Sequence, residues 1–246
     1  MTDRAPLLML AGTREARLLA DKLAENSRWQ VTASLAGVTT APAELPVETR
    51  IGGFGGIEGL VRYLEDNQIA AVVDATHSFA GRMSANAVAA CARVGVPLLR
   101  VERPAWTPLP DAVWVDAQDA TEAAALLPSG ARAFLTVGSN SMEPFRTRDD
   151  VWYLIRTLEA LTGDFPFAQG VFVHGMPGQK VDDESVLMDQ HRITHLVTKN
   201  AGGPAFAKVE AAAGLQIQTV MIARPHLPPA ETVVDVEGAL HWLGQR

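Results

Sequence analysis

The stretch from Leu7 to Glu25 constrains the fold more than any other part of the chain. Residues 7–11 form a short apolar run, long enough for a strand that is buried on both faces. Gly12 and Thr13 follow at once, and apolar residues then recur at helical spacing as far as Leu23. A buried strand, a tight turn and an amphipathic helix in this order predict the first half of a βαβ unit.

The turn between this strand and this helix has two interpretations. The first N–H groups of the helix and its dipole favour an anion above the sheet edge. Gly12 would allow close approach, Thr13 would add a hydroxyl donor, and Arg14 or Arg17 would add a positive charge. The turn has only one glycine of the G-x-G-x-x-G dinucleotide fingerprint, so this stretch alone slightly favours an ordinary βα turn.

Composition limits the class of protein. The 246 residues are 48% hydrophobic, which is enough for one large domain or two small ones. The formal net charge of −7 argues against broad binding of nucleic acid or of anionic membranes. The single cysteine, Cys91, lies on the apolar face of a predicted helix and is expected to pack in the core. No leader and no apolar stretch near the ~20 residues of a membrane span is visible, so we expect a soluble cytoplasmic protein.

Strands and helices alternate along the rest of the chain, with a proline-rich linker at residues 107–110. This alternation predicts an α/β fold of two lobes, each a mostly parallel sheet flanked by helices, with a cleft between them. The domains are expected at residues 1–106 and 107–246. In the second domain, Asp182 is the expected N-cap of one helix and Pro204 the expected first residue of another. Strands are predicted at 30–35, 47–51, 70–75, 97–101, 113–115, 133–137, 151–155, 172–173, 194–198 and 217–222.

The end of the second strand bears on the choice of nucleotide. Many NAD-binding folds place an acidic residue there to hold the ribose 2′-hydroxyl. This chain has none, and instead carries Ser34, Gly37, Thr39 and Thr40. Small hydroxyl residues leave room for a 2′-phosphate and so favour NADP, although a plain turn rich in small residues also fits.

Other loops that follow predicted strands carry further candidates. The glycine-rich segment 52–56 is interpreted as a ligand-facing loop, with a flexible hinge as the alternative. His77 is expected either to donate to a cofactor phosphate or a substrate, or to brace a neighbouring loop. Arg103, near Trp106, is expected either to hold a carboxylate against a flat apolar wall or to pair with a nearby acid.

Several chemistries are excluded by missing motifs. His191 and His195 are four residues apart but fall near a predicted strand, and neither H-E-x-x-H nor C-x-x-C occurs, so no metal site is expected. The absence of G-x-S-x-G and of G-x-x-x-x-G-K-[ST] argues against serine hydrolases and P-loop NTPases.

Several motifs together resemble one family, the precorrin-6A reductases of cobalamin biosynthesis. They lie in the same order along nearly the whole chain. The motifs are Gly12-Thr13-x-Glu15-Ala16-Arg17, Gly52-Gly53-Phe54-Gly55, Asp74-Ala75-Thr76-His77-x-Phe79-Ala80, Arg103-Pro104-x-Trp106 and Lys199-Asn200-x-Gly202-Gly203. The chain departs from the family pattern at Ser78, where proline is usual, and at Ala201, where serine is usual.

The resemblance implies two Rossmann-like lobes with NADPH between them. The implied reaction is hydride reduction of one carbon–carbon double bond of an anionic tetrapyrrole, precorrin-6A, to precorrin-6B. Either His77 or solvent would supply the proton. The expected cofactor contacts are Gly12, Thr13, Arg14, Arg17, Ser34, Gly37, Gly53, His77, Ser78, Phe79, Lys199, Asn200, Gly202 and Gly203. The expected substrate contacts are Arg103, Ser139 and Lys208.

Two other classes stay open on the residues alone. One is a non-catalytic protein that binds a nucleotide or a tetrapyrrole. The other is a two-lobed tetrapyrrole synthase or lyase without a redox cofactor. In every case we expect no nucleic-acid or membrane partner, and a monomer or a small homo-oligomer.

Overall fold

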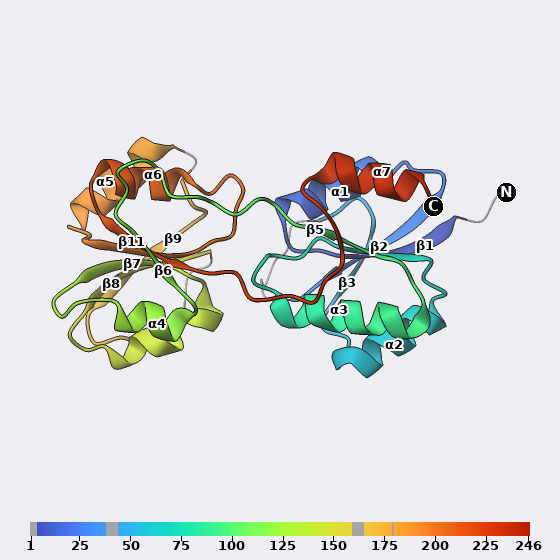
Figure 1. Cartoon of the computed structure of the whole chain (residues 1–246), viewed down its shortest axis with the longest axis horizontal. Helices are drawn as coiled ribbons and strands as arrows, with labels where there is room; N and C mark the ends of the chain where they lie inside the picture. Colours follow the sequence, from blue (N-terminus) through green and yellow to red (C-terminus); the bar gives the residue numbers. More distant parts are fainter. Residues whose placement is uncertain (1–3, 38–43, 159–164, 179) are drawn as a thin grey trace. The chain divides into compact units, whose positions relative to one another are not determined.

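The computed structural model describes residues 4–37, 44–158, 165–178 and 180–246. These residues form two compact units, each with a six-stranded sheet (Figure 1). The first unit contains residues 1–104 and 225–246, and the second contains residues 105–224. Every strand pair in both sheets is parallel, so the predicted α/β class is confirmed.

The first sheet has the order β12-β5-β4-β1-β2-β3. Its strands are β1 (Ala5–Leu10), β2 (Trp29–Leu35), β3 (Glu48–Ile51), β4 (Ala71–Asp74), β5 (Leu98–Val101) and β12 (Glu231–Val233). Helices α1 (Arg14–Leu23) and α7 (Val236–Gly244) cover one face, and α2 (Gly56–Asp66) and α3 (Gly81–Val94) cover the other (Figure 1). Alternate residues of the buried strands face the two helical layers: Leu7 and Met9 pack on the α1 side, and Leu8 and Leu10 on the α2–α3 side.

The second sheet has the order β6-β11-β10-β7-β8-β9. Its strands are β6 (Trp114–Ala117), β7 (Arg132–Thr136), β8 (Trp152–Thr157), β9 (Gly170–His174), β10 (His195–Lys199) and β11 (Gln218–Ile222). Helices α5 (Val181–Gln190) and α6 (Ala207–Gly214) cover one face, and α4 (Ala120–Ala125) lies on the other (Figure 1). Two short 3₁₀ helices, η1 (Ser139–Ser141) and η2 (Glu143–Thr147), follow β7.

The edge strand beside β5 corrects the expected domain boundary. Residues 107–246 were predicted to form one domain, but β12 pairs in parallel with β5, and α7 packs against the first sheet. The chain therefore leaves the first unit after β5 and returns to it after β11. Both sheets have the same plan. In the first sheet β12 is the edge strand next to β5, and in the second sheet β6 is the edge strand next to β11.

Two predicted helix starts differ from the structure, and one helix has a side-chain cap that was not predicted. The Thr13 side chain caps α1, since it accepts a hydrogen bond from the Ala16 N–H. Asp182 is not an N-cap, because α5 begins one residue earlier, after Lys180. Pro204 is not the first helical residue, because α6 begins only at Ala207.

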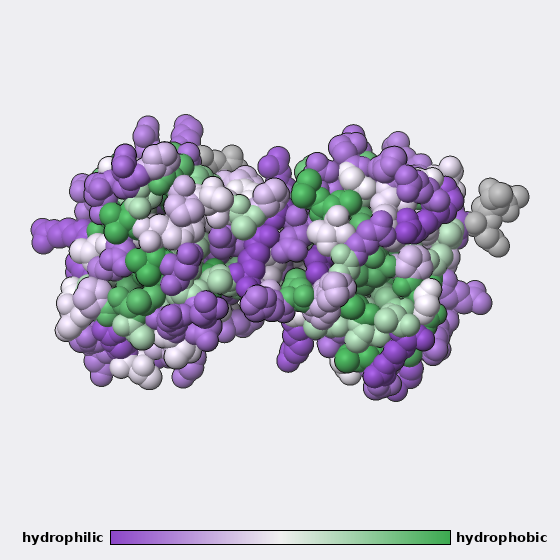
Figure 2. Space-filling view, viewed as in Figure 1, coloured by the Kyte–Doolittle hydropathy of each residue, from purple (hydrophilic) through white to green (hydrophobic). Residues whose placement is uncertain are grey.

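None of the described helices is long and apolar enough to cross a lipid bilayer. On the face drawn in Figure 2, hydrophobic residues are interspersed with hydrophilic ones over each unit.

Candidate functional site

The strand order of the first sheet reverses at β1, which pairs with β2 on one side and with β4 on the other. Open parallel sheets bind ligands beyond the carboxyl ends of their strands at such a reversal. The loops at this position are the turn after β1 and the loop after β4, residues 75–80. The candidate site is therefore built around these two loops, with the neighbouring ends of β2 and β3.

The turn after β1 leaves its backbone open to a ligand. Gly12 is exposed and has φ of 150°, a conformation that disfavours other residues. A Cβ atom placed on Gly12 would meet no atom within 4 Å, so this side of the turn borders open space. Arg14 and Arg17, on the first turns of α1, are also exposed.

The hydroxyl of Thr13 does not have the expected role. Its proton is donated to the Ala75 carbonyl at 2.8 Å, while its oxygen accepts the Ala16 N–H at 3.1 Å. A hydroxyl has a single proton to donate, so the prediction that this group donates to a phosphate is wrong. Thr13 instead ties the turn after β1 to the loop after β4.

Arg50 is a further candidate site residue that no sequence motif had indicated. Arg50 is the next-to-last residue of β3 and lies beside Ser34 of β2, its direct neighbour in the strand register. One terminal nitrogen of its guanidinium donates to Ser34 Oγ at 2.7 Å and to the Gly52 carbonyl at 3.0 Å, and the other donates to the Gly53 carbonyl at 3.2 Å. The guanidinium carbon lies 4.0 Å from the ring centre of Phe54. Arg50 thus clamps the glycine loop to the end of β2.

The predicted cofactor contacts around Arg50 differ in exposure. Ser34 is buried beneath Arg50, whereas Gly37 and Gly53 are exposed. Thr39 and Thr40 lie outside the described residues.

The loop after β4 presents His77, Ser78 and Phe79 at the same edge. His77 is exposed, and its Nδ1 accepts the Phe79 N–H at 3.2 Å. The ring proton of neutral His77 is then on Nε2. Ser78 and Phe79 are half-buried.

Arg103 pairs with an acid, as one of its two predicted roles requires. It lies 3.3 Å from Glu15, which belongs to the first turn of α1, and both side chains are largely buried. Arg103 belongs to the first unit and Trp106 to the second, where Trp106 packs against Phe206.

The loop after β10 contains the remaining cofactor candidates. The Asn200 side chain accepts from the Trp106 N–H at 2.8 Å and donates to the Trp106 carbonyl at 3.0 Å. The Asn200 amide therefore fixes the backbone at Trp106, just after the chain passes from the first unit to the second. Burial lowers the pKa of Lys199, and Gly202 is buried while Gly203 is half-buried.

The three predicted substrate residues differ in exposure. Ser139 is exposed at the start of η1. Lys208 is only 4% exposed, and its Nζ donates to the Ala205 carbonyl at 2.6 Å and lies 4.8 Å from the Trp106 ring centre. Burial lowers the pKa of Lys208 to about 8. Lys208 is therefore a packed residue of the second unit, and its contact with the substrate stays a prediction.

Two further features bear on alternative chemistry. Burial, assisted by the negative charge of Asp74, raises the pKa of the Cys91 thiol to about 12, which fits its predicted place in the core. The described residues contain no group of three or more metal-ligating side chains.

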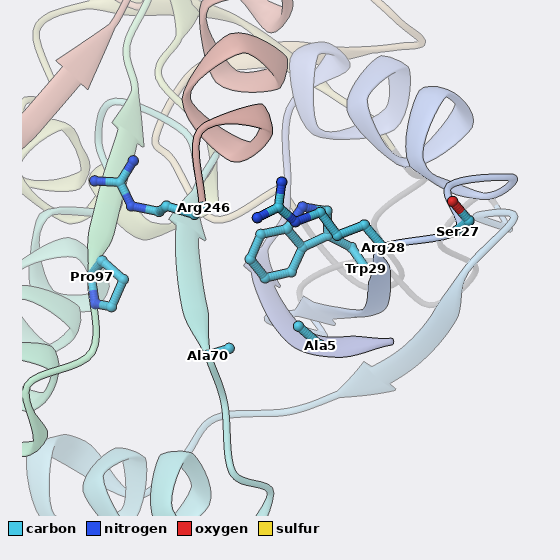
Figure 3. A pocket seen from close by; sticks show the side chains of 7 residues that line it. All are labelled: Ala5, Ser27, Arg28, Trp29, Ala70, Pro97 and Arg246. Atoms are coloured by element: carbon cyan, nitrogen blue, oxygen red, sulfur yellow. The ribbon is translucent and has the colours of Figure 1, made fainter. Parts of the chain in front are cut away.

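A pocket of about 610 Å³ opens at the opposite edge of the first sheet (Figure 3). It is lined by Ala5, Ser27, Arg28, Trp29, Ala70, Pro97 and Arg246, at the amino ends of the strands. The reversal of strand order, not this pocket, marks the edge where parallel sheets bind nucleotides.

Both units have the Rossmann-like plan, and the first has an open turn at its reversal of strand order. These features define an α/β protein built from Rossmann-like units. A family model described as "Precorrin-6x reductase CbiJ/CobK" matches residues 6–244. The chain belongs to this family of reductases.

Individual relatives agree with this assignment. The chain is 44% identical over 248 residues to the precorrin-6A reductase of Rhodococcus erythropolis, covering 97% of each chain. It is 41% identical to that of Rhodobacter capsulatus, covering 96% of this chain and 95% of the relative. A solved structure described as "CobK precorrin-6A reductase" has a TM-score of 0.91 at 40% identity, covering 98% of this chain and 96% of the solved one.

Proposed function

We propose that this protein reduces one carbon–carbon double bond of precorrin-6A with NADPH, giving precorrin-6B, and that NADPH binds at the carboxyl edge of the first sheet. The reductase family and the names of the relatives support the reaction. The observation that carries the choice of cofactor is the Arg50 guanidinium, held beside Ser34 at the ends of β2 and β3.

The residues of the turn after β1 fit the pyrophosphate of a dinucleotide. Gly12 leaves open space above the backbone, and the start of α1 directs its first N–H groups to the same side. Exposed Arg14 and Arg17 add positive charge near this position. Because the Thr13 hydroxyl is committed to Ala75, we assign the contact with the phosphates to the backbone of the turn.

Arg50 fits the 2′-phosphate that distinguishes NADPH from NADH. The ribose of a bound dinucleotide lies near the end of β2, where an arginine accommodates the 2′-phosphate and an acid would repel it. Here β2 ends in Ser34-Leu35, and Arg50 is the cation next to it. Stacking on Phe54 and the hydrogen bonds to Gly52 and Gly53 hold the guanidinium in place before a ligand arrives.

The chain's share of the chemistry is positioning and proton supply. NADPH, when bound, supplies the hydride. His77, Ser78 and Phe79 lie at the edge where the nicotinamide end is expected, and His77 Nε2 is the candidate proton donor, with solvent as the alternative. Lys199, Gly202 and Gly203 remain candidate contacts of the second unit for cofactor or substrate. Arg103 and Ser139 remain candidates for the substrate carboxylates.

Replacing Arg50 with methionine tests the assignment of the cofactor. Loss of a charge-assisted hydrogen bond to a phosphate is expected to raise the dissociation constant for NADPH by about tenfold or more. The constant for NADH, which has no 2′-phosphate, should change far less. Both constants are measured by nucleotide fluorescence titration of the full chain.

The matched control is Arg62→Met, which removes an exposed arginine from α2. It should leave the preference for NADPH as it is in the unmodified protein. An unchanged preference in Arg50→Met would contradict the role of Arg50. If the unmodified protein oxidised neither nucleotide in the presence of precorrin-6A, a non-catalytic binding protein or a synthase without a redox cofactor would be favoured instead.

A further inference from the structure

A buried charged pair lies directly below the loop after β4. Asp74 ends β4, Arg100 is its register neighbour in β5, and the two residues are 1% and 7% exposed. Arg100 Nε lies 3.8 Å from Asp74 Oδ2, and one of its terminal nitrogens donates to the Pro228 carbonyl at 3.2 Å. A guanidinium at this depth needs a nearby anion, which Asp74 supplies.

The other carboxylate oxygen of Asp74 holds the loop. Asp74 Oδ1 accepts both the Thr76 hydroxyl at 2.7 Å and the Thr76 N–H at 3.2 Å. The residue between them, Ala75, accepts the Thr13 hydroxyl through its carbonyl. Two hydrogen-bond networks therefore fix the loop after β4: one to the buried pair and one to the turn after β1.

Asp74 itself is out of reach of a ligand. The pocket that Asp74, Thr76 and Arg100 line with His77 and Ser78 has a volume of about 10 Å³. That is room for no more than about one water, so no part of a nucleotide can enter it. Any effect of Asp74 on a nucleotide must pass through Thr76 and the residues that follow.

We propose that Asp74, balanced by Arg100, is a positioning residue that holds residues 76–79 in the conformation that binds NADPH. Asp74 acts through its hydrogen bond to the Thr76 hydroxyl and touches neither cofactor nor substrate. This inference rests on the proposed function, because it assumes that the loop after β4 contacts NADPH.

Thr76→Val is the most direct test. Valine keeps the shape of the side chain and leaves the Asp74–Arg100 pair intact, but it removes the hydroxyl proton that Asp74 accepts. We expect the dissociation constant for NADPH, from fluorescence titration, to rise about tenfold. Thr76→Ser keeps the hydroxyl and should restore tight binding.

The control is Glu58→Gln, which breaks the exposed pair of Glu58 with Arg93 in the same unit. It should bind NADPH like the unmodified protein. Unchanged NADPH binding in Thr76→Val, or equal weakening in Thr76→Ser, would overturn the role of Asp74. Failure of the unmodified protein to bind NADPH would instead overturn the proposed function, so the two failures are distinguishable in one set of titrations.

Discussion

Replacing Gly59 with alanine is expected to lower the free energy of unfolding by about 3 kcal/mol and to weaken NADPH binding. Gly59 lies inside α2, where a Cβ atom would come within 1.6 Å of the Phe54 carbonyl oxygen. That oxygen belongs to the backbone, so the loop at residues 52–56 must move. Since Arg50 is bonded to Gly52 and Gly53, the guanidinium would move with the loop.

The comparison that isolates this effect is Gly214→Ala, at the end of α6. A Cβ atom there meets nothing within 4 Å, and alanine favours a helix by about 1 kcal/mol over glycine. Urea unfolding should therefore show a large loss for Gly59→Ala and no loss for Gly214→Ala. Equal stabilities of the two variants would mean that the close approach of Phe54 to α2 is wrong.

Replacing Glu184 with glutamine is expected to lower the free energy of unfolding by about 3–5 kcal/mol. Glu184 is 1% exposed, and its Oε1 accepts from Arg156 at 2.7 Å and from the Gly178 N–H at 2.6 Å. The negative charge of Glu184 also raises the pKa of Lys208, against the larger effect of burial. Glutamine keeps the shape but leaves Arg156 and Lys208 without this buried anion.

The measurement is the free energy of unfolding at pH 7, with Glu143→Gln as the control. The pair of Glu143 with Arg146 is exposed, with 79% and 44% of the side chains accessible, so its loss should cost less than about 1 kcal/mol. An equally small loss of unfolding free energy for Glu184→Gln would contradict the view that Glu184 balances the buried positive charges of Arg156 and Lys208.

The sequence predicted the layers of the fold because apolar runs and helical spacing are local signals. The buried strand β1, the turn at Gly12 and the amphipathic helix α1 all follow from such signals. β12 does not, because it is three residues long, partly exposed, and becomes a strand only by pairing with β5. The return of residues 225–246 to the first unit therefore could not be predicted from local pattern.

Single residues of the candidate site also depend on contacts that local sequence pattern does not predict. In the sequence Arg50 is one cation in a short predicted strand, and its contact with Ser34 depends on the register between β2 and β3. Thr13 was correctly placed at the turn, but the acceptor of its proton, Ala75, is 62 residues away in the sequence. The sequence did carry a signal for Arg50. It is an arginine two residues before a run of glycines, near the end of a strand, and the preceding strand ends without an acidic residue.

Hydrogen–deuterium exchange of the full chain, with and without saturating NADP⁺, tests the location of the cofactor most directly. We expect slower exchange on NADP⁺ binding at the backbone amides of residues 12–16, 50–56 and 76–80, the three loops at the carboxyl edge of the first sheet. Protection confined to the second unit, or no protection in these three segments while NADP⁺ is bound, would contradict a cofactor site at this edge.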